Sequence, residues 1–278
     1  MPQPLLLADT PHLLYRGFFA LPDSIKGADG RPVNALLGSV NQLLWCIERY
    51  EPRAVVCCFG QEAATYRTEL YPPYHAHRPP MPDDLEHQWG KAHAFYEALG
   101  WTVTVHDELE ADDLMHAYAS AEVDAGGRAQ ILTGDRDMFQ CAARDGITIL
   151  LQRARQEGPD EMGAAEVEQR YGVPPALVPD FIALRGDPSD KLPGAPGVGP
   201  KKAASLLAQY GSLDAALEAG RFPQNKEDLL LYRRIATLDA SAPLPPLSDQ
   251  SPTWAEASSL LRTWGLNQSA DRLAARTD

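Results

Sequence analysis

ILTGDRD, residues 131–137, is a short apolar run that ends in a glycine turn carrying two acids. Such a run, closed by Gly and Asp, is typical of a buried strand that ends at a turn. The same pattern occurs at residues 5–9, where LLLAD ends in Asp9. We therefore expect Asp9 and Asp135 at the carboxyl ends of strands, where α/β proteins place their reactive groups.

The rest of the chain predicts an α/β fold with a helical appendage. Further strands are predicted at 54–59 (AVVCCF), 101–106 (WTVTVH) and 147–151 (ITILL), and helices at 34–50, 83–99 and about 110–125. Strands alternating with helices predict a mainly parallel sheet flanked by helices. We predict an α/β core at 1–172, a helical region at 173–240, and a Pro-rich connection with two C-terminal helices at 241–278.

Composition narrows the class of protein. At 278 residues and 44% hydrophobic content, the chain can bury a sizeable core. It has no apolar stretch of membrane-spanning length, and its four cysteines lack zinc spacing, so we expect a cytoplasmic monomer with no membrane partner. The net charge of −13 means that any nucleic acid must be bound through local basic patches.

Eight acids follow the predicted strands or their connecting turns. They are Asp9, Glu110, Asp112, Asp113, Asp135, Asp137, Asp187 and Asp190. Each group alone has a simpler explanation, as helix-start acids, a helix cap or a turn. Taken together, like charges that converge need compensation, and oxygen-only ligands suit Mg²⁺ or Mn²⁺. The set predicts metal-assisted phosphoryl transfer.

Two further segments carry basic or glycine-rich chemistry. GAPGVGPKKAASLL, residues 194–207, predicts either a tight turn or a helix start that holds a DNA phosphate, with Lys201 and Lys202 adding charge. It lacks the Gly-Lys-Ser/Thr of a nucleotide-binding loop, so we exclude ATP. YRTELYPPYHAHRPPMPDDL, residues 66–85, mixes arginines with tyrosines that suit phosphates and bases, while His75 and His77 alone are weak evidence for zinc.

Together these segments resemble the 5′-nuclease (flap endonuclease) family, most closely the 5′→3′ exonuclease domain of bacterial DNA polymerase I, here as a stand-alone chain. The phrases that carry the resemblance run in family order over about residues 5 to 220: GRPVNALLG, YHAHRPPMPDDL, ELEADDL, TGDRDM, YGVPP and LRGDPSDKLPGAPGVGPKKAASLL. The resemblance implies a PIN-like core with a helix-three-turn-helix element that binds DNA.

The resemblance also assigns residues. It implies that Asp9, Glu110, Asp112 and Asp113 serve one metal ion and that Asp135, Asp137, Asp187 and Asp190 serve a second. It places Arg16, Arg67, His75 and Arg78 near the scissile phosphate. It implies that Gly197, Val198, Gly199, Lys201 and Lys202 hold the duplex, with a K⁺ ion at that loop.

Two positions depart from the family pattern. Phe59 is followed by Gly60 where the family has an acid, and His75 stands where the family has a lysine that stabilises the scissile phosphate. Glu62 lies close enough in sequence to replace the missing acid. We expect Gly60→Asp to raise Mg²⁺-dependent activity if that missing acid limits the reaction.

The sequence therefore predicts a metal-dependent 5′→3′ exonuclease and 5′-flap endonuclease in bacterial replication or repair. Its expected partners are branched, nicked or 5′-ended DNA, or an RNA–DNA hybrid. The alternative is a junction-binding protein of the same fold whose catalysis is weakened or lost, which Gly60 and His75 motivate. A metal phosphatase unrelated to nucleic acid is disfavoured by the loop at 186–204.

Overall fold

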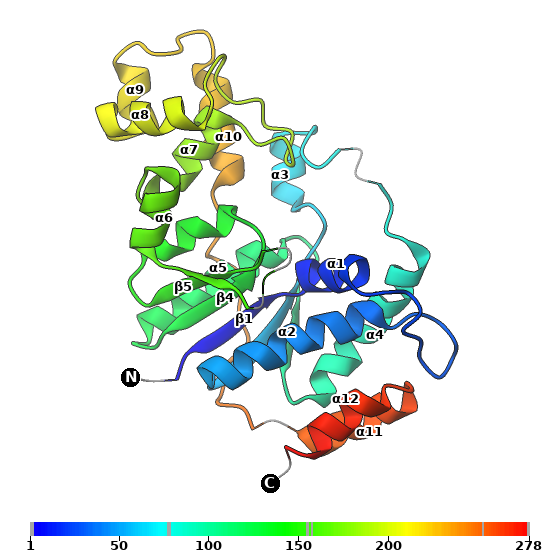
Figure 1. The fold of residues 1–278 in the computed structure, drawn as a ribbon. Helices are drawn as coiled ribbons and strands as arrows, with labels where there is room; N and C mark the ends of the chain where they lie inside the picture. The colour runs from blue at the N-terminus through cyan, green and yellow to red at the C-terminus, as the bar shows by residue number, and fades with distance from the viewer. Residues whose placement is uncertain (1–2, 77–78, 154–155, 157, 252, 277–278) are drawn as a thin grey trace.

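The computed structural model describes residues 3–76, 79–153, 156, 158–251 and 253–276, and its strands form one sheet (Figure 1). In the described part the sheet has the order β3-β2-β1-β4-β5-β6, and all its pairings are parallel except that of β5 with β6. The strands are β1 (Leu5–Asp9), β2 (Ala54–Phe59), β3 (Thr102–Val105), β4 (Ala129–Thr133), β5 (Ile147–Leu151) and β6 (Asp160–Met162). The predicted mainly parallel sheet is confirmed.

Helices bury both faces of the sheet, because alternate strand residues point to opposite sides. Leu6 and Ala8 face the core formed with α1 (Thr10–Ala20), α2 (Asn34–Tyr50), α4 (Asp83–Ala98), α11 (Trp254–Thr263) and α12 (Asn267–Ala274). Leu5 and Leu7 face the core formed with α5 (Ala111–Asp124), the 3₁₀ helix η1 (Asp137–Ala143) and α6 (Ala164–Tyr171). Continuous apolar strands are therefore explained by burial on both sides.

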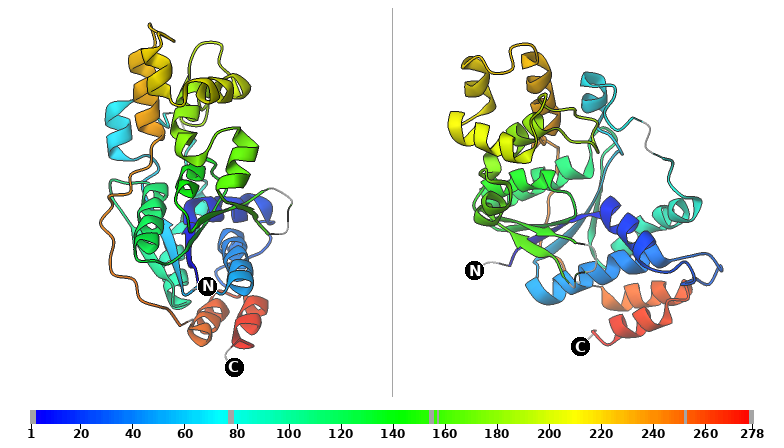
Figure 2. Two further views of the ribbon diagram at one scale, coloured as in Figure 1. Left: turned by 90° about the vertical axis from the view of Figure 1, so that its left-hand side faces the viewer. Right: turned by 45° about the horizontal axis from the view of Figure 1, so that its top comes forward.

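A group of short helices stands above the sheet in Figure 1, and Figure 2 shows it from two other directions. It contains η2 (Pro175–Leu177), α7 (Val178–Arg185), α8 (Pro200–Tyr210), α9 (Leu213–Glu218) and α10 (Lys226–Ala236). Asp180 joins three of these helices, because its carboxylate accepts from the Leu213 N–H at 2.8 Å and pairs with Arg233 at 3.5 Å. α3 (Thr65–Leu70) packs against α10.

Beyond α10 the chain returns along the core without regular structure, and we call residues 237–251 the return segment. Gln250 anchors its far end, accepting from the Val55 N–H and donating to Thr102, each at 2.8 Å. Two short helices, α11 and α12, follow the return segment. Among the described helices, none has the length and apolar character needed to cross a membrane.

The sequence patterns missed α1, α3, α6 and β6. The helix α1 begins with no linker after β1, because the Asp9 carboxylate caps it by accepting from the His12 N–H at 3.1 Å. Three of the missed elements have eight residues or fewer, and elements of that length show too few periods for a hydrophobic pattern to be recognised.

Candidate active site

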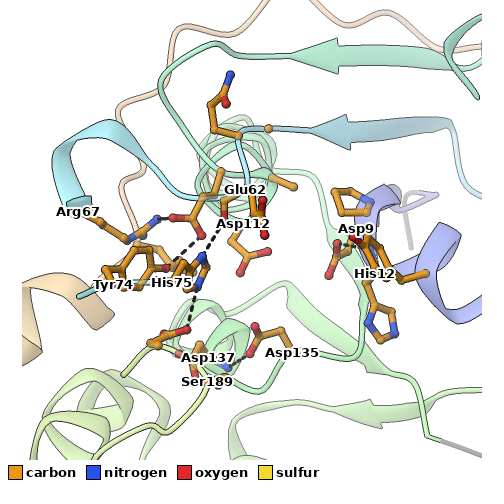
Figure 3. Close-up of a pocket in the computed structure, with 18 of the residues that line it drawn as sticks. Asp9, His12, Glu62, Arg67, Tyr74, His75, Asp112, Asp135, Asp137 and Ser189 are labelled. Carbon is orange, nitrogen blue, oxygen red and sulfur yellow. Dashed lines mark hydrogen bonds and ion pairs between the residues drawn. The ribbon is translucent and has the colours of Figure 1, made fainter. Parts of the chain in front are cut away.

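A pocket of about 600 Å³ opens at the carboxyl ends of the parallel strands (Figure 3). The α/β core forms most of its wall, and Asp190 and the end of α10 close it from the helical region. Six of the eight predicted acids line this pocket, namely Asp9, Glu110, Asp112, Asp135, Asp137 and Asp190. Asp113 and Asp187 lie outside its lining.

The two strands at the centre of the sheet orient the first acids. β1 and β4 are neighbours although the chain visits β2 and β3 between them, so the pocket lies at the switch point of the strand order. Thr133, at the end of β4, donates to Asp9 at 2.6 Å and accepts from the Asp135 N–H at 2.9 Å. The Asp135 carboxylate accepts from the Asp137 N–H at 2.8 Å. Asp9 and Asp135 therefore accept hydrogen bonds from backbone N–H groups just after their strands and also line the pocket.

The charges of these acids oppose one another. Withdrawal from water and the charges of Asp9 and Asp135 raise the pKa of Asp112 well above its usual range. The same two effects, with Asp190 as a major neighbour, raise the pKa of Asp137 strongly and that of Asp135 to about 6. Solvent still reaches Asp135 through the pocket mouth. Carboxylates that share one concave space favour a bound cation.

The donor set fits divalent metal. The pocket acids supply only oxygen ligands, which suit Mg²⁺ or Mn²⁺. Within the described residues, however, no three candidate side chains already converge on one point as ligands of a single ion.

Arg67 lines the pocket and pairs with two carboxylates there. Its guanidinium donates to both oxygens of Asp113 at 2.8 Å and lies 3.0 Å from Glu110, while its Nε donates to the Ile235 carbonyl at 3.0 Å. The side chain is 2% exposed and that of Asp113 is fully buried. Figure 3 shows Arg67 beside Tyr74, across the pocket from Asp9. These contacts direct most of the Arg67 guanidinium to protein acceptors, and its contact with a phosphate stays a prediction.

His75 lies at the pocket between the core and the helical region. Its Nδ1 is 2.7 Å from the Glu62 carbonyl and its Nε2 is 3.0 Å from the Asp190 carboxylate. The ring stacks on Tyr74 with centroids 3.9 Å apart, and the backbone is left-handed at φ 52°. Glu62 lines the pocket with an exposed side chain, so it remains the candidate to replace the missing acid.

Gly60 has no space for a side chain. A Cβ at this position would lie 2.4 Å from the Ala111 nitrogen and 2.5 Å from the Leu109 carbonyl oxygen. The next residue holds the two segments together, because the Gln61 N–H donates to that same carbonyl at 2.8 Å. The structure therefore argues against a gain of activity in Gly60→Asp, because the backbone of residues 109–111 occupies the space that a side chain would need.

Of the two remaining predicted cations, the structure describes only Arg16, which is not among the residues that line this pocket. Arg16 lines a second, smaller cavity with α2 and the segment after β5, and it donates to the Arg153 carbonyl at 2.6 Å. Arg78 and its neighbour His77 lie outside the described residues. Their assignment to the scissile phosphate stays a prediction.

The glycine-rich loop presents backbone to solvent. Gly197 has φ 68°, and neither it nor Gly199 would meet another atom if a Cβ were added, so both positions are open to a ligand. Val198 is buried beneath them. Lys201 and Lys202 begin α8 with exposed side chains. The loop therefore has the exposed helix start that phosphate binding requires.

Sequence reasoning missed several pocket residues. Tyr74 donates to Glu110 at 3.2 Å, and Tyr15, Trp89 and Met81 form an apolar wall. The Tyr15 and Trp89 rings meet edge to face at 6.4 Å. Neither apolar character nor helical spacing distinguishes such residues from ordinary core positions, so no sequence signal could have identified this wall.

Comparison with known families matches almost the whole chain. Residues 4–172 match the model "5′-3′ exonuclease, N-terminal resolvase-like domain", and residues 173–256 match "5′-3′ exonuclease, C-terminal SAM fold". The chain belongs to the 5′-3′ exonuclease family. The predicted family and the predicted α/β fold with its helical region are confirmed.

Individual relatives within this family differ in length. The 5′-3′ exonuclease of Streptomyces coelicolor is 33% identical, with 96% of this chain and 98% of the relative covered. The DNA polymerase I of Mycobacterium tuberculosis is 37% identical over 215 residues. That match covers 77% of this chain and 24% of the polymerase, so the chain spans about a quarter of such relatives.

Solved structures share the fold at low identity. A bacteriophage T5 flap endonuclease in a pseudo-enzyme–product complex with DNA and metal ions gives a TM-score of 0.66 at 17% identity, with 98% of this chain and 97% of that chain covered. The catalytic core of Rad2 in complex with DNA substrate gives 0.65 at 13% identity, covering 99% and 92%.

Proposed function

We propose that this protein is a divalent-metal-dependent, structure-specific 5′→3′ exonuclease and 5′-flap endonuclease. The observation that carries the proposal is the pocket that brings together six of the predicted acids, several of which have pKa values raised by one another and by burial. The pocket lies between the sheet and the helical region. A duplex bound at the glycine-rich loop would place a phosphodiester near its 5′ end in this pocket.

The pocket acids fall into two sets. We propose that Asp9, Glu110 and Asp112 hold one ion and that Asp135, Asp137 and Asp190 hold the other. Asp113 and Asp187 support them: Asp113 pairs with Arg67, and Asp187 accepts from the Ser189 N–H at 2.9 Å beside Asp190. Bound Mg²⁺ or Mn²⁺ supplies an activated water and stabilises charge on the phosphate.

The chain's own residues position the strand to be cut. The apolar wall excludes water from one side of the pocket, and Thr133 holds Asp9 and Asp135 in register. Recognition through loop backbone and lysines follows the shape of DNA rather than its sequence. We further propose Mg²⁺ or Mn²⁺ as the ion, K⁺ at the loop of residues 194–199, action on RNA–DNA hybrids, and a cytoplasmic monomer at the bacterial nucleoid.

A 5′-flap DNA carrying a 5′ label tests this function against its rival. With Mg²⁺ or Mn²⁺, we expect a cut near the junction, and with EDTA no product. Tight binding of the flap without product in either metal would favour the alternative, a junction-binding protein that has lost catalysis. Product formation in EDTA would contradict metal dependence.

The lysines at the start of α8 give a separate prediction. Lys201→Ala with Lys202→Ala should weaken binding to duplexes of unrelated sequence alike and reduce the slope of log affinity against log salt by about 2, one for each lost phosphate contact. Arg262→Ala is the control, since Arg262 lies on α11 and pairs with Asp271. Binding measured by anisotropy across a salt series checks this, and an unchanged slope would contradict it.

A further inference from the structure

Arg67 joins three segments that are distant in the chain. From α3 it contacts Asp113 and Glu110 at the start of α5 and the Ile235 carbonyl in the last turn of α10. The return segment reaches the same cluster, because the Asp239 N–H donates to Asp113 at 2.9 Å. We call Arg67 and Asp113 the buried pair.

The buried pair directs most of its polar groups to protein, although Arg67 also lines the pocket. Asp113 is fully buried and Arg67 is 2% exposed, and the guanidinium Nε and both terminal nitrogens are each hydrogen-bonded to protein. A guanidinium that offers its fork to one carboxylate is held in a fixed orientation. This arrangement suits a group that positions others and not one that receives a phosphate.

Glu110 is the pocket residue that the buried pair controls. One of its oxygens lies 3.0 Å from Arg67 and accepts from the Ala64 N–H at 2.7 Å, and the other accepts from Tyr74. Its side chain is 12% exposed and lines the pocket beside Asp112. Removal of the Arg67 fork would free Glu110 to turn and leave its charge less compensated.

We propose that Arg67 is a positioning residue that sets Glu110 for metal binding and fixes the end of α10, and with it the helical region, against the pocket. This inference deepens the proposed function and rests on it. Outer partners of metal ligands typically change metal affinity 10- to 100-fold when they are replaced. The alternative is a direct contact between Arg67 and the scissile phosphate.

Direct titration of Mn²⁺ into DNA-free protein separates the two roles. Arg67→Lys keeps the charge but loses the fork, and we expect Mn²⁺ binding to weaken about tenfold. Arg53→Lys is the matched control, because Arg53 also pairs with a buried acid, Glu122, and with the return segment at Asp249. We expect its Mn²⁺ affinity to remain that of the wild type, although its melting temperature falls.

Single-turnover cleavage across a Mn²⁺ series completes the test. A positioning role predicts a raised half-saturating Mn²⁺ concentration for Arg67→Lys, with most of the rate recovered at saturation. Normal Mn²⁺ binding together with a low rate at saturation would overturn the proposal in favour of a phosphate contact. Tyr74→Phe removes only one hydroxyl contact to Glu110. Tyr74→Phe should shift Mn²⁺ affinity in the same direction as Arg67→Lys. The proposal can therefore still be tested if Arg67→Lys does not fold. Because the titration needs no substrate, a protein without nuclease activity would still give this readout.

Discussion

Gly60→Ala is expected to lower the free energy of unfolding by about 1–3 kcal/mol, the usual cost of an overpacked site. The new methyl group would meet the backbone at Glu110 and Ala111, which cannot rotate away as a side chain would. The start of α5 must therefore shift, carrying Glu110 out of position. Thermal unfolding should show a fall of about 3 °C per kcal/mol, and flap cleavage should decrease as well.

Gly90→Ala is the matched control for Gly60→Ala. Gly90 lies inside α4, and nothing is within 4 Å of an added Cβ. Alanine is favoured over glycine in a helix interior by up to about 1 kcal/mol, so this variant should be neutral or slightly more stable. Gly60→Asp should be worse than Gly60→Ala, since it adds charge to a crowded acidic site. A gain of activity in Gly60→Asp would show that the backbone of residues 109–111 can move to accommodate the aspartate side chain.

Asp135→Asn is expected to have the largest effect on catalysis. Loss of one metal ligand should remove several kcal/mol of charge stabilisation, and about 3 kcal/mol corresponds to a rate decrease of about 100-fold. Without metal, the same variant should melt at an equal or higher temperature than the wild type, because one of several repelling charges is gone. Single-turnover kinetics and metal-free melting measure the two effects.

The opposite signs of these effects distinguish a functional acid from a structural one. Asp145→Asn serves as the control. Asp145 is exposed in the turn that enters β5, at the amino ends of the strands and so away from the pocket. It should leave both measurements unchanged. Full activity in Asp135→Asn would remove Asp135 from the metal site, and a large fall in its metal-free melting temperature would indicate a structural role.

The ends of β1 and β4 could be predicted from sequence, because an apolar run that stops at an acid indicates both a buried strand and the residue at which it ends. Asp9 and Asp135 terminate apolar runs of β1 and β4, and parallel pairing then brings them to one edge. The phrases ELEADDL, TGDRDM and LRGDPSD identified the remaining pocket acids only as groups. Spacing could not show that Asp112 enters the pocket while Asp113, one residue on, turns back to Arg67.

The rest of the site depends on contacts between distant segments. The sequence suggests that Gly60 marks a missing metal ligand. In the structure, the backbone of residues 109–111 packs against Gly60 and leaves no space for a side chain. Arg67 was predicted to face a phosphate, but Ile235 and Asp239 lie about 170 residues further along the chain, and no local pattern reveals that they meet its cluster. Such contacts are set by the tertiary fold.

The most direct test of the central claim is the anomalous difference map of a crystal grown with Mn²⁺ and a 5′-flap DNA. We expect Mn²⁺ peaks within the pocket, at about 2.0–2.3 Å from oxygens of Asp9, Glu110 or Asp112 and of Asp135, Asp137 or Asp190. The scissile phosphate should lie between the two sets of acids. A pocket that contains DNA but no Mn²⁺ peak would contradict the account.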